Sequence, residues 1–132
     1  MPHFRKSAGI LIKDRKLLIV RNEGKPFIGP GGKIEAGESD EQALVRELNE
    51  ELAITVDPAD LDDFGTFEAP AATNPSITIS MHVFMVNKWT GKPEASSEIA
   101  EAVWISSTTN LPVDSIFAQE VIPRLKELDL ID

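Results

Sequence analysis

The chain has 132 residues, of which 42% are hydrophobic and 27% are charged. This size and composition are typical of one soluble globular domain, so we expect a single domain over residues 1–132. The formal net charge of −9 argues against a long nucleic acid as partner, because a protein that follows phosphates needs a basic face. A phosphorylated small molecule stays compatible with this charge if a divalent cation lies between carboxylates and phosphate.

The chain contains no cysteine, which excludes a disulfide framework, a thiolate nucleophile and a zinc-thiolate site. No apolar stretch approaches the roughly 20 residues that a membrane helix needs. The basic residues at the N-terminus are followed by only a short apolar run without a cleavage pattern, so no targeting signal is expected. We therefore expect no membrane partner and, by default, a cytoplasmic location.

The first half of the chain predicts a hairpin, a loop and a helix. Apolar runs at residues 7–12 and 16–21 flank a polar turn and favour a β-hairpin. Residues 22–37 hold five of the eight glycines and two of the nine prolines, which predicts a loop. Ser39 and Gln42 fit a capping box, and good helix formers follow without Gly or Pro, so a helix is expected over residues 40–52.

The second half predicts mainly strands and a last helix. Residues 77–89 alternate in side-chain type with a period of two, which indicates a long strand after a loop at residues 70–75. Residues 115–128 have near-helical spacing, although Pro123 must kink or divide that helix. Short strands are also expected at residues 55–56, 64–67 and 102–105. The predicted fold class is α/β, an α+β sandwich with a mixed β-sheet between helices.

The helix expected at residues 40–52 has an apolar face and an acidic face. The apolar face holds Leu44, Val45, Leu48 and Leu52, and the acidic face holds Glu47, Glu50 and Glu51. Exposed like charges repel by a few tenths of a kcal/mol per pair, so a cation there would be favourable. Mg²⁺ prefers such oxygen ligands. The alternative is a solvated acidic face partnered by Arg46, but the preceding Pro30-Gly31-Gly32 permits close backbone approach and favours a ligand site.

Residues 32–54 resemble the Nudix box, the signature of the Nudix hydrolase family, written G-x5-E-x7-R-E-U-x-E-E-x-G-U with U a bulky apolar residue. The matching residues are Gly32, Glu38, Arg46, Glu47, Leu48, Glu50, Glu51 and Ile54. The loop at residues 30–38 is similar to that of compact MutT-like members. Ala53 departs from the pattern, where the family has glycine. A non-glycine residue in a left-handed cap costs roughly 1–2 kcal/mol, so the helix is expected to end differently here.

The resemblance implies a metal-dependent catalytic site. The implied metal ligands are Glu47, Glu50, Glu51, Glu98 and the backbone carbonyl of Gly31, with Glu101 as the reserve for Glu98. They would bind Mg²⁺, or Mn²⁺ in its place. The implied catalytic residues are Glu47, Arg46, Glu50 and Glu51, with Glu47 as general base and Arg46 orienting the carboxylates. For Glu98 and Glu101, an ordinary surface position is the alternative.

Substrate-binding residues are expected at Arg21, Gly32, Lys33 and Gln119. Arg21 and Gln119 have alternatives as a solvated charge and an exposed helix residue. Phe27 and Phe117 can stack on a base, although both also suit the core. Pro70 lies sixteen residues beyond the box, a position that, by the resemblance, marks ADP-ribose-hydrolysing members. The alternative is an ordinary loop proline, since Pro75 is nearby. No catalytic role is expected for His3 or His82.

The resemblance implies hydrolysis of a diphosphate linkage in a small nucleotide. The first expectation is a nucleoside triphosphate pyrophosphohydrolase, acting on oxidised or other non-standard nucleotides and releasing a nucleoside monophosphate and pyrophosphate. The alternative is an ADP-ribose or nucleotide-sugar diphosphatase. From another class, the alternative is a module that senses a nucleotide without cleaving it. The protein is expected to be a monomer or a homodimer.

Overall fold

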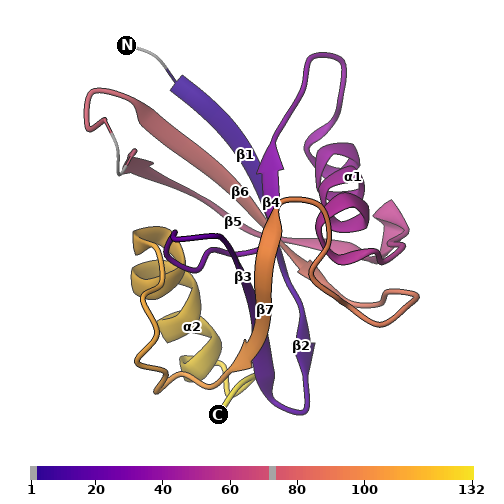
Figure 1. The fold of residues 1–132 in the computed structure, drawn as a ribbon, viewed down its shortest axis with the longest axis vertical. Coiled ribbons are helices and arrows are strands. Elements are labelled where there is room, and N and C mark those ends of the chain that lie inside the picture. The colour runs from indigo at the N-terminus through magenta and orange to yellow at the C-terminus, as the bar shows by residue number, and fades with distance from the viewer. Residues whose placement is uncertain (1–2, 72–73) are drawn as a thin grey trace.

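The computed structural model describes residues 3–71 and 74–132, and within these two ranges seven strands form two sheets. The sheets lie between helices α1 and α2, which are on opposite sides of the molecule (Figure 1). One sheet has the order β4-β1-β6-β5 and the other the order β2-β3-β7. The strands are β1 His3–Ile10, β2 Ile12–Lys13, β3 Lys16–Asn22, β4 Gly31–Lys33, β5 Leu61–Pro70, β6 Thr78–Val86 and β7 Ile99–Ile105.

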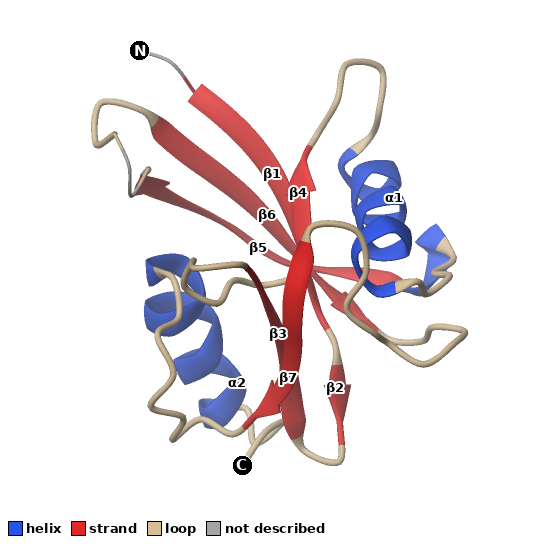
Figure 2. Ribbon diagram, in the orientation of Figure 1, coloured by secondary structure: helices blue, strands red, loops and turns tan. Residues whose placement is uncertain are grey.

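The helical elements are α1 Asp40–Leu52, a short 3₁₀ turn η1 Pro58–Asp60, a π-helical turn η2 Phe117–Val121 and α2 Ile122–Glu127 (Figure 2). The predicted α+β sandwich with mixed strand directions is confirmed, since β1 is parallel to β6 and antiparallel to β4. The described strands form two sheets where one was expected. No helix among the described residues has the length and apolar character needed to cross a membrane.

The hydrophobic core has two parts, one on each side of the sheets. Alternate residues of β6 reach opposite parts: Met81 and Val83 pack with α2, and Phe84 and Val86 pack with α1. The predicted strand is therefore present, but both of its faces contribute to the core, whereas strict alternation would leave one face exposed. The buried side of α1 consists of Ala43, Leu44, Leu48 and Leu52 together with Glu51.

The expected hairpin at residues 7–12 and 16–21 is only partly correct. Ile12 and Lys13 pair with β3, but the preceding residues form β1 in the other sheet, between β4 and β6. Residues 7–11 are all buried, so both edges and both faces of this segment need neighbours. A two-stranded hairpin cannot supply them, and the partners β4 and β6 are distant in the sequence.

Several strand boundaries also differ from those expected. The loop predicted at residues 22–37 contains the short strand β4, whose two glycines hide its pairing with β1 from any propensity scale. Residues 55–56 are not a strand, although Thr55 forms an isolated bridge to Thr90. The strands expected at residues 64–67 and 102–105 are longer, and that expected at 77–89 is shorter. Residues 72 and 73 of the expected loop at 70–75 lie outside the described residues.

Helix α1 begins as predicted and ends in a way that corrects the expectation. The Ser39 and Gln42 capping box is present in both directions. Ala53 takes the left-handed conformation, with φ of 56°, which glycine would take more easily. The Asn49 side chain donates to the carbonyl of Ile54 at 3.2 Å, and the fully buried Ile54 anchors the chain after the cap. Packing therefore holds the left-handed cap without glycine.

The last helix is divided as Pro123 predicted. The π-helical turn η2 directly precedes α2, and Pro123 is the second residue of α2. Residues 113–116, directly before η2, line a cleft of the molecule.

Candidate active site

The acidic face of α1 is turned toward β4, and its innermost member is Glu51. Glu51 is 4% exposed, and its carboxylate accepts a hydrogen bond from the Gly31 backbone N–H at 2.9 Å. Burial, followed by the charges of Glu47, Glu98 and Glu50, raises the pKa of Glu51 to about 8, although the Gly31 hydrogen bond acts in the opposite direction. A buried carboxylate among like charges is in an environment that a cation would relieve.

Glu47 lies one turn earlier, between Arg46 and the backbone of β4. Arg46 Nη1 donates to Glu47 Oε1 at 2.8 Å. Burial raises the pKa of Glu47, and Arg46 counteracts only part of this effect. A Cβ atom at Gly32 would lie 2.6 Å from the Glu47 carboxyl carbon, so glycine is what lets this carboxylate rest against the strand. Gly31 is equally constrained, since a Cβ there would lie 2.0 Å from the Ser7 carbonyl oxygen.

Arg46 joins α1 to the loop that precedes it. Its Nε and Nη2 donate to the two carboxylate oxygens of Glu38 at 2.7 and 3.0 Å, and Nη2 also reaches the Lys33 carbonyl at 3.1 Å. The hydrogen bonds from Arg46 hold the pKa of Glu38 below its ordinary value. Glu38 matches the Nudix pattern but was given no site role from the sequence. Its two hydrogen bonds to Arg46 now connect the loop to the acidic face.

Glu98 lies just before β7 and close to the acidic face of α1. Its charge contributes to the raised pKa of both Glu47 and Glu51, and the backbone N–H of Ser96 donates to the Glu51 carbonyl at 2.9 Å. Glu98 accepts a hydrogen bond from Ser97 Oγ at 2.6 Å, which lowers its own pKa. Glu101, the reserve candidate, instead forms an ion pair with Arg21 across β3 and β7.

The donor set suits a hard divalent cation, although the side chains are not gathered around one point. Among the described residues, no three acidic or histidine side chains lie close enough together to hold a metal ion as they stand. The four glutamates nevertheless influence one another electrostatically, and one of them is buried with a raised pKa. Carboxylate oxygens in such a cluster are the ligands that magnesium and manganese take.

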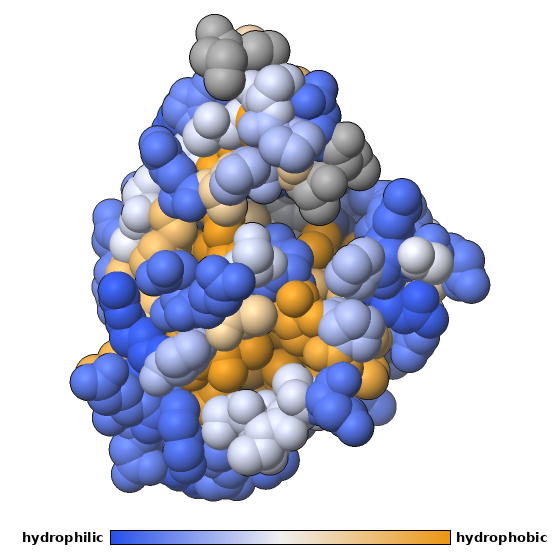
Figure 3. All heavy atoms as spheres, turned by 90° about the vertical axis from the view of Figure 1, so that its left-hand side faces the viewer, coloured by the Kyte–Doolittle hydropathy of each residue, from blue (hydrophilic) through white to orange (hydrophobic). Residues whose placement is uncertain are grey.

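A cleft of about 810 Å³ opens between the two sheets on the other side of β4. The face drawn in Figure 3 carries apolar side chains gathered in a hollow, with hydrophilic residues around it. Most of the cleft wall is apolar and comes from β1, β5, β6 and the segment before η2. Its polar side chains are Lys6, Asn22, Lys25, Lys33, Asp114 and Ser115.

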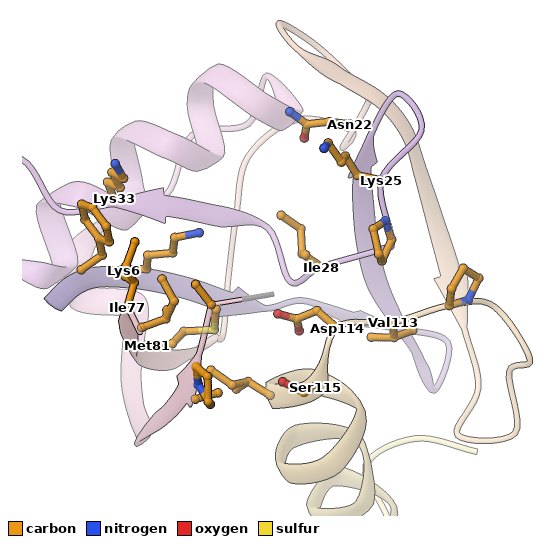
Figure 4. Close-up of a pocket in the computed structure, with 18 residues that line it drawn as sticks. Lys6, Asn22, Lys25, Ile28, Lys33, Ile77, Met81, Val113, Asp114 and Ser115 are labelled. Carbon is orange, nitrogen blue, oxygen red and sulfur yellow. The ribbon is translucent and has the colours of Figure 1, made fainter. Parts of the chain in front are cut away.

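Asp114 directs its carboxylate into this cleft from the segment before η2, across from the end of β3 that carries Asn22 (Figure 4). Burial raises the pKa of Asp114, while a hydrogen bond from the Phe117 N–H at 3.3 Å and the charge of Lys6 oppose this effect. The Asp114 backbone N–H donates to the Phe27 carbonyl at 2.9 Å, which fixes its position. Neither residue was singled out from the sequence, because nothing in their local pattern brings them together.

The four expected substrate residues are placed differently by the fold. Lys33 lines the cleft, with its ammonium 4.2 Å from the ring centroid of Phe4, and Gly32 lies beside it in β4. Arg21 is not among the lining residues, because it pairs with Glu101 and lies over the Phe27 ring. Gln119 is exposed on η2, also outside the cleft lining. Phe27 and Phe117 are buried in the core.

The fold is an α+β sandwich of two sheets between helices. Its site combines an acidic cluster on α1 with an apolar cleft on the other side of β4. The family model of the NUDIX domain matches residues 3–125, so the chain belongs to the Nudix domain family. Nudix hydrolases generally need divalent metal ions. The resemblance based on residues 32–54 is therefore confirmed at the level of the family.

Three curated relatives are similar over most of this chain. The 8-oxo-dGTP diphosphatase of Escherichia coli K12 is 44% identical over 100 residues, covering 75% of this chain and 73% of the relative. The 8-oxo-dGTP diphosphatase of Haemophilus influenzae is 40% identical over 92 residues, covering 67% and 63%. The ADP-ribose pyrophosphatase of Methanocaldococcus jannaschii is 33% identical over 108 residues, covering 79% and 62%. The chain thus spans less than two thirds of the last two relatives.

The same fold is found in solved structures. A structure from a study of MutT from Aliivibrio salmonicida and Vibrio cholerae matches with a TM-score of 0.74 and 27% identity. The match covers 96% of this chain and 98% of that one. The arrangement of sheets and helices is therefore that of the MutT-like structures.

Proposed function

We propose that the protein hydrolyses a diphosphate linkage in a small nucleotide, with a nucleoside triphosphate as the first substrate class. The observation that carries this proposal is the position of β4 between the acidic cluster and the cleft. A Cβ at Gly32 would collide with the Glu47 carboxylate, while the next residue, Lys33, lines the cleft. A nucleoside in the cleft would therefore have its phosphates beside the glutamates.

The acidic cluster would hold the metal. We assign Glu47, Glu50, Glu51, Glu98 and the Gly31 carbonyl as ligands for Mg²⁺, with Mn²⁺ as a substitute. A bound divalent ion neutralises phosphate oxygens and lowers the pKa of water. Glu47 is assigned as the general base, since its carboxylate is half-buried and its pKa is raised, which moves it toward the operating pH. Arg46 would hold Glu47 in place through the hydrogen bond between them.

The cleft would bind the nucleoside. Its apolar wall suits a base, and Asn22 and Asp114 supply the hydrogen-bonding groups that a base edge requires. Lys33 and Lys6 give positive charge near the phosphates. Gly32 would allow close approach of the backbone to the ligand. Arg21 and Gln119 lie outside the cleft lining, so they would bind the substrate only if it extends beyond the cleft. The names of the E. coli and H. influenzae relatives support an oxidised guanine nucleotide in this cleft.

An ADP-ribose or nucleotide-sugar diphosphatase is the second candidate. Two observations favour it: the M. jannaschii relative is named an ADP-ribose pyrophosphatase, and Pro70 lines the cleft at the end of β5. The net charge of −9 supports a small ligand bound through a cation in either case, rather than a long nucleic acid. We keep the monomeric or homodimeric state and the cytoplasmic location as predictions from the sequence.

Product analysis distinguishes these functions. The protein is incubated with nucleoside triphosphates, oxidised nucleotides and nucleoside diphosphate sugars, each with Mg²⁺, Mn²⁺ or chelator. Release of pyrophosphate and a nucleoside monophosphate supports the first candidate, and two monophosphates from a diphosphate conjugate support the second. Glu50→Gln should reduce either activity, whereas Glu41→Gln serves as control because Glu41 is exposed on the same helix. Ligand-induced thermal stabilisation with no cleavage of any compound would overturn the hydrolase and favour the sensing module.

A further inference from the structure

The side chain of His82 on β6 connects two carboxylates that belong to different elements. Its Nδ1 lies 2.7 Å from Asp40 Oδ2 on α1, and its Nε2 lies 2.9 Å from Asp63 Oδ2 on β5. An ionised carboxylate only accepts hydrogen bonds, so each ring nitrogen must donate a proton to satisfy both contacts. The geometry therefore fits the imidazolium form, whose ring packs against Phe84 at a centroid distance of 4.0 Å.

Asp40 is the first residue of α1, and several further contacts hold it. Arg5 Nη2 on β1 donates to both oxygens of the Asp40 carboxylate, at 2.8 and 2.9 Å. Ser7 Oγ, also on β1, donates to the Asp40 backbone carbonyl at 2.7 Å. The Asp40 side chain thus binds the N-terminal turn of α1 to β1 and β6, and His82 extends this connection to β5. The same helix carries Glu47, Glu50 and Glu51 on its next turns.

The charges around this contact balance only when His82 is protonated. The groups that face His82 are Asp40 from α1 and Asp63 from β5, with Arg5 from β1 beyond Asp40 and the uncharged Ser7. Two carboxylates therefore face the cations Arg5 and His82. Loss of the His82 proton removes one cation and leaves at least one ring nitrogen without a proton for its carboxylate.

We propose that His82 is a positioning residue for the reaction, because its imidazolium braces the first turn of α1 and so fixes the direction of the glutamates further along the helix. This inference rests on the proposed hydrolase function. It concerns a residue outside the Nudix box, for which the sequence predicted no catalytic role. His82 acts through α1, since its side-chain partners are Asp40, Asp63 and Phe84 and include no glutamate of the acidic cluster.

The brace should weaken as pH rises. Burial alone would lower the pKa of His82, but the hydrogen bonds to Asp40 and Asp63 outweigh it and raise the pKa. A histidine with a raised pKa in the folded protein contributes its full stability below the ordinary value near 6.5, and loses it as pH passes through the higher folded value. Turnover should therefore fall on the alkaline side of that value.

His82→Gln provides the kinetic test, because glutamine keeps hydrogen bonding at this position and removes the charge. At pH 6 we expect its kcat to be about tenfold below that of the wild type, with a smaller change in KM, since misplaced catalytic groups reduce the chemical step. The two proteins should converge as pH rises above the His82 pKa. A kcat ratio that stays constant at every pH, or equal activity at pH 6, would overturn the proposal.

Asp63→Asn is the second variant, and it leaves α1 and His82 unchanged. It replaces an exposed ionised acceptor with a neutral one, so the alkaline fall in kcat should move to lower pH. An unchanged pH profile would contradict the assignment. Because Asp63 is on the edge strand β5 and its side chain is 67% exposed, this variant keeps the test available if His82→Gln fails to fold.

An NMR titration of the metal-free protein separates this inference from the proposed function, because it needs no substrate. The His82 ring should keep its second proton to a higher pH than an ordinary imidazole, because its pKa is raised. Its titration should be accompanied by faster amide hydrogen exchange in the first turn of α1. His3→Gln assigns the signals, since the chain has only two histidines. Titration of His82 without any change in α1 would overturn the brace, whatever the substrate panel shows.

Discussion

The Glu51 carboxylate accepts a hydrogen bond from the Gly31 backbone N–H at 2.9 Å, inside a region where Glu51 is only 4% exposed. This contact joins the C-terminal half of α1 to β4, and it satisfies one oxygen of a buried acid. It does not offset the cost of burying a charge, because the pKa of Glu51 is raised to about 8. The acidic cluster is therefore under electrostatic strain until a cation or a proton is present.

Replacing Glu51 with glutamine should stabilise the metal-free protein at alkaline pH. The folded pKa of about 8 exceeds the ordinary value of 4.5, so the folded state retains a proton that the unfolded state releases. The wild-type free energy of unfolding should therefore decrease as pH rises between these values. At pH 9 we expect Glu51→Gln to be more stable by about 2 kcal/mol, a discounted value at 1.36 kcal/mol per pKa unit.

Urea unfolding at pH 5 and pH 9 measures this difference, with chelator present. The variant can still accept the Gly31 hydrogen bond, so packing should be preserved. Added Mg²⁺ should raise the melting temperature of the wild type and have little effect on Glu51→Gln, because a ligand is lost. Equal pH dependence of stability in the two proteins would contradict the burial of an ionisable Glu51.

Glu47→Gln should fold normally and lose turnover. The amide can still accept the hydrogen bond from Arg46, but it cannot take a proton from water at useful pH. We expect kcat to fall by roughly 10² to 10⁴, the contribution of general-base catalysis. Steady-state kinetics on the best substrate of the panel gives the value, and Glu41→Gln is the control. A kcat within threefold of the wild type would move the base elsewhere, and Glu98→Gln would then be tested.

Ala53→Gly should stabilise the protein, because Ala53 has a φ of 56° and its side chain is exposed. Glycine removes a strain of roughly 1–2 kcal/mol in the left-handed region. Glycine also gives the unfolded chain more conformational freedom, which offsets part of this stabilisation. We therefore expect the free energy of unfolding to increase by about 0.5–1 kcal/mol. Thermal unfolding should show a rise of about 2–4 °C with unchanged kcat. A decrease in melting temperature would show that the Ala53 methyl group contributes packing.

Asp114→Asn should change the choice of base. The substitution keeps the size of the side chain and the acceptor for the Phe117 N–H, but replaces a hydroxyl or carboxylate oxygen with an NH₂ group. We expect kcat/KM to fall by about 10- to 100-fold for the preferred base, mainly through KM, and to change less for a poorer one. Competition between oxidised and ordinary guanine nucleotides measures this. Equal losses for all bases would indicate that Asp114 only shapes the cleft.

The acidic face of α1 illustrates what could be predicted from local residues. Ser39, Gln42 and the repeat of leucines predicted the start and the buried side of the helix, and the spacing of the glutamates predicted that they share a face. Local spacing could not show that Glu51 would be buried and Glu50 exposed, because this depends on β4 and the segment around Ser96 packing over one edge of the helix.

The cleft illustrates what local residues could not provide. Asn22 and Asp114 are 92 positions apart in the sequence, and no motif connects them. They line one cleft because the segment after β3 pairs with the segment before η2, through Phe27 and Val113. Arg21 shows the opposite case: its position after an apolar strand suggested a phosphate contact, whereas the register of β3 and β7 places Glu101 opposite it.

The sequence by itself determined the family, the extent of α1, the period-two strand at β6 and the identity of the acidic cluster, since each depends on residues that are near one another along the chain. The tertiary structure decided the division into two sheets, the strand formed by Gly31 and Gly32, the left-handed cap at Ala53, the cleft and the His82 contact. The physical reason is that strand pairing, burial and electrostatic environment arise between segments far apart in the chain. Their effect on one residue depends on which distant neighbours the fold brings to it.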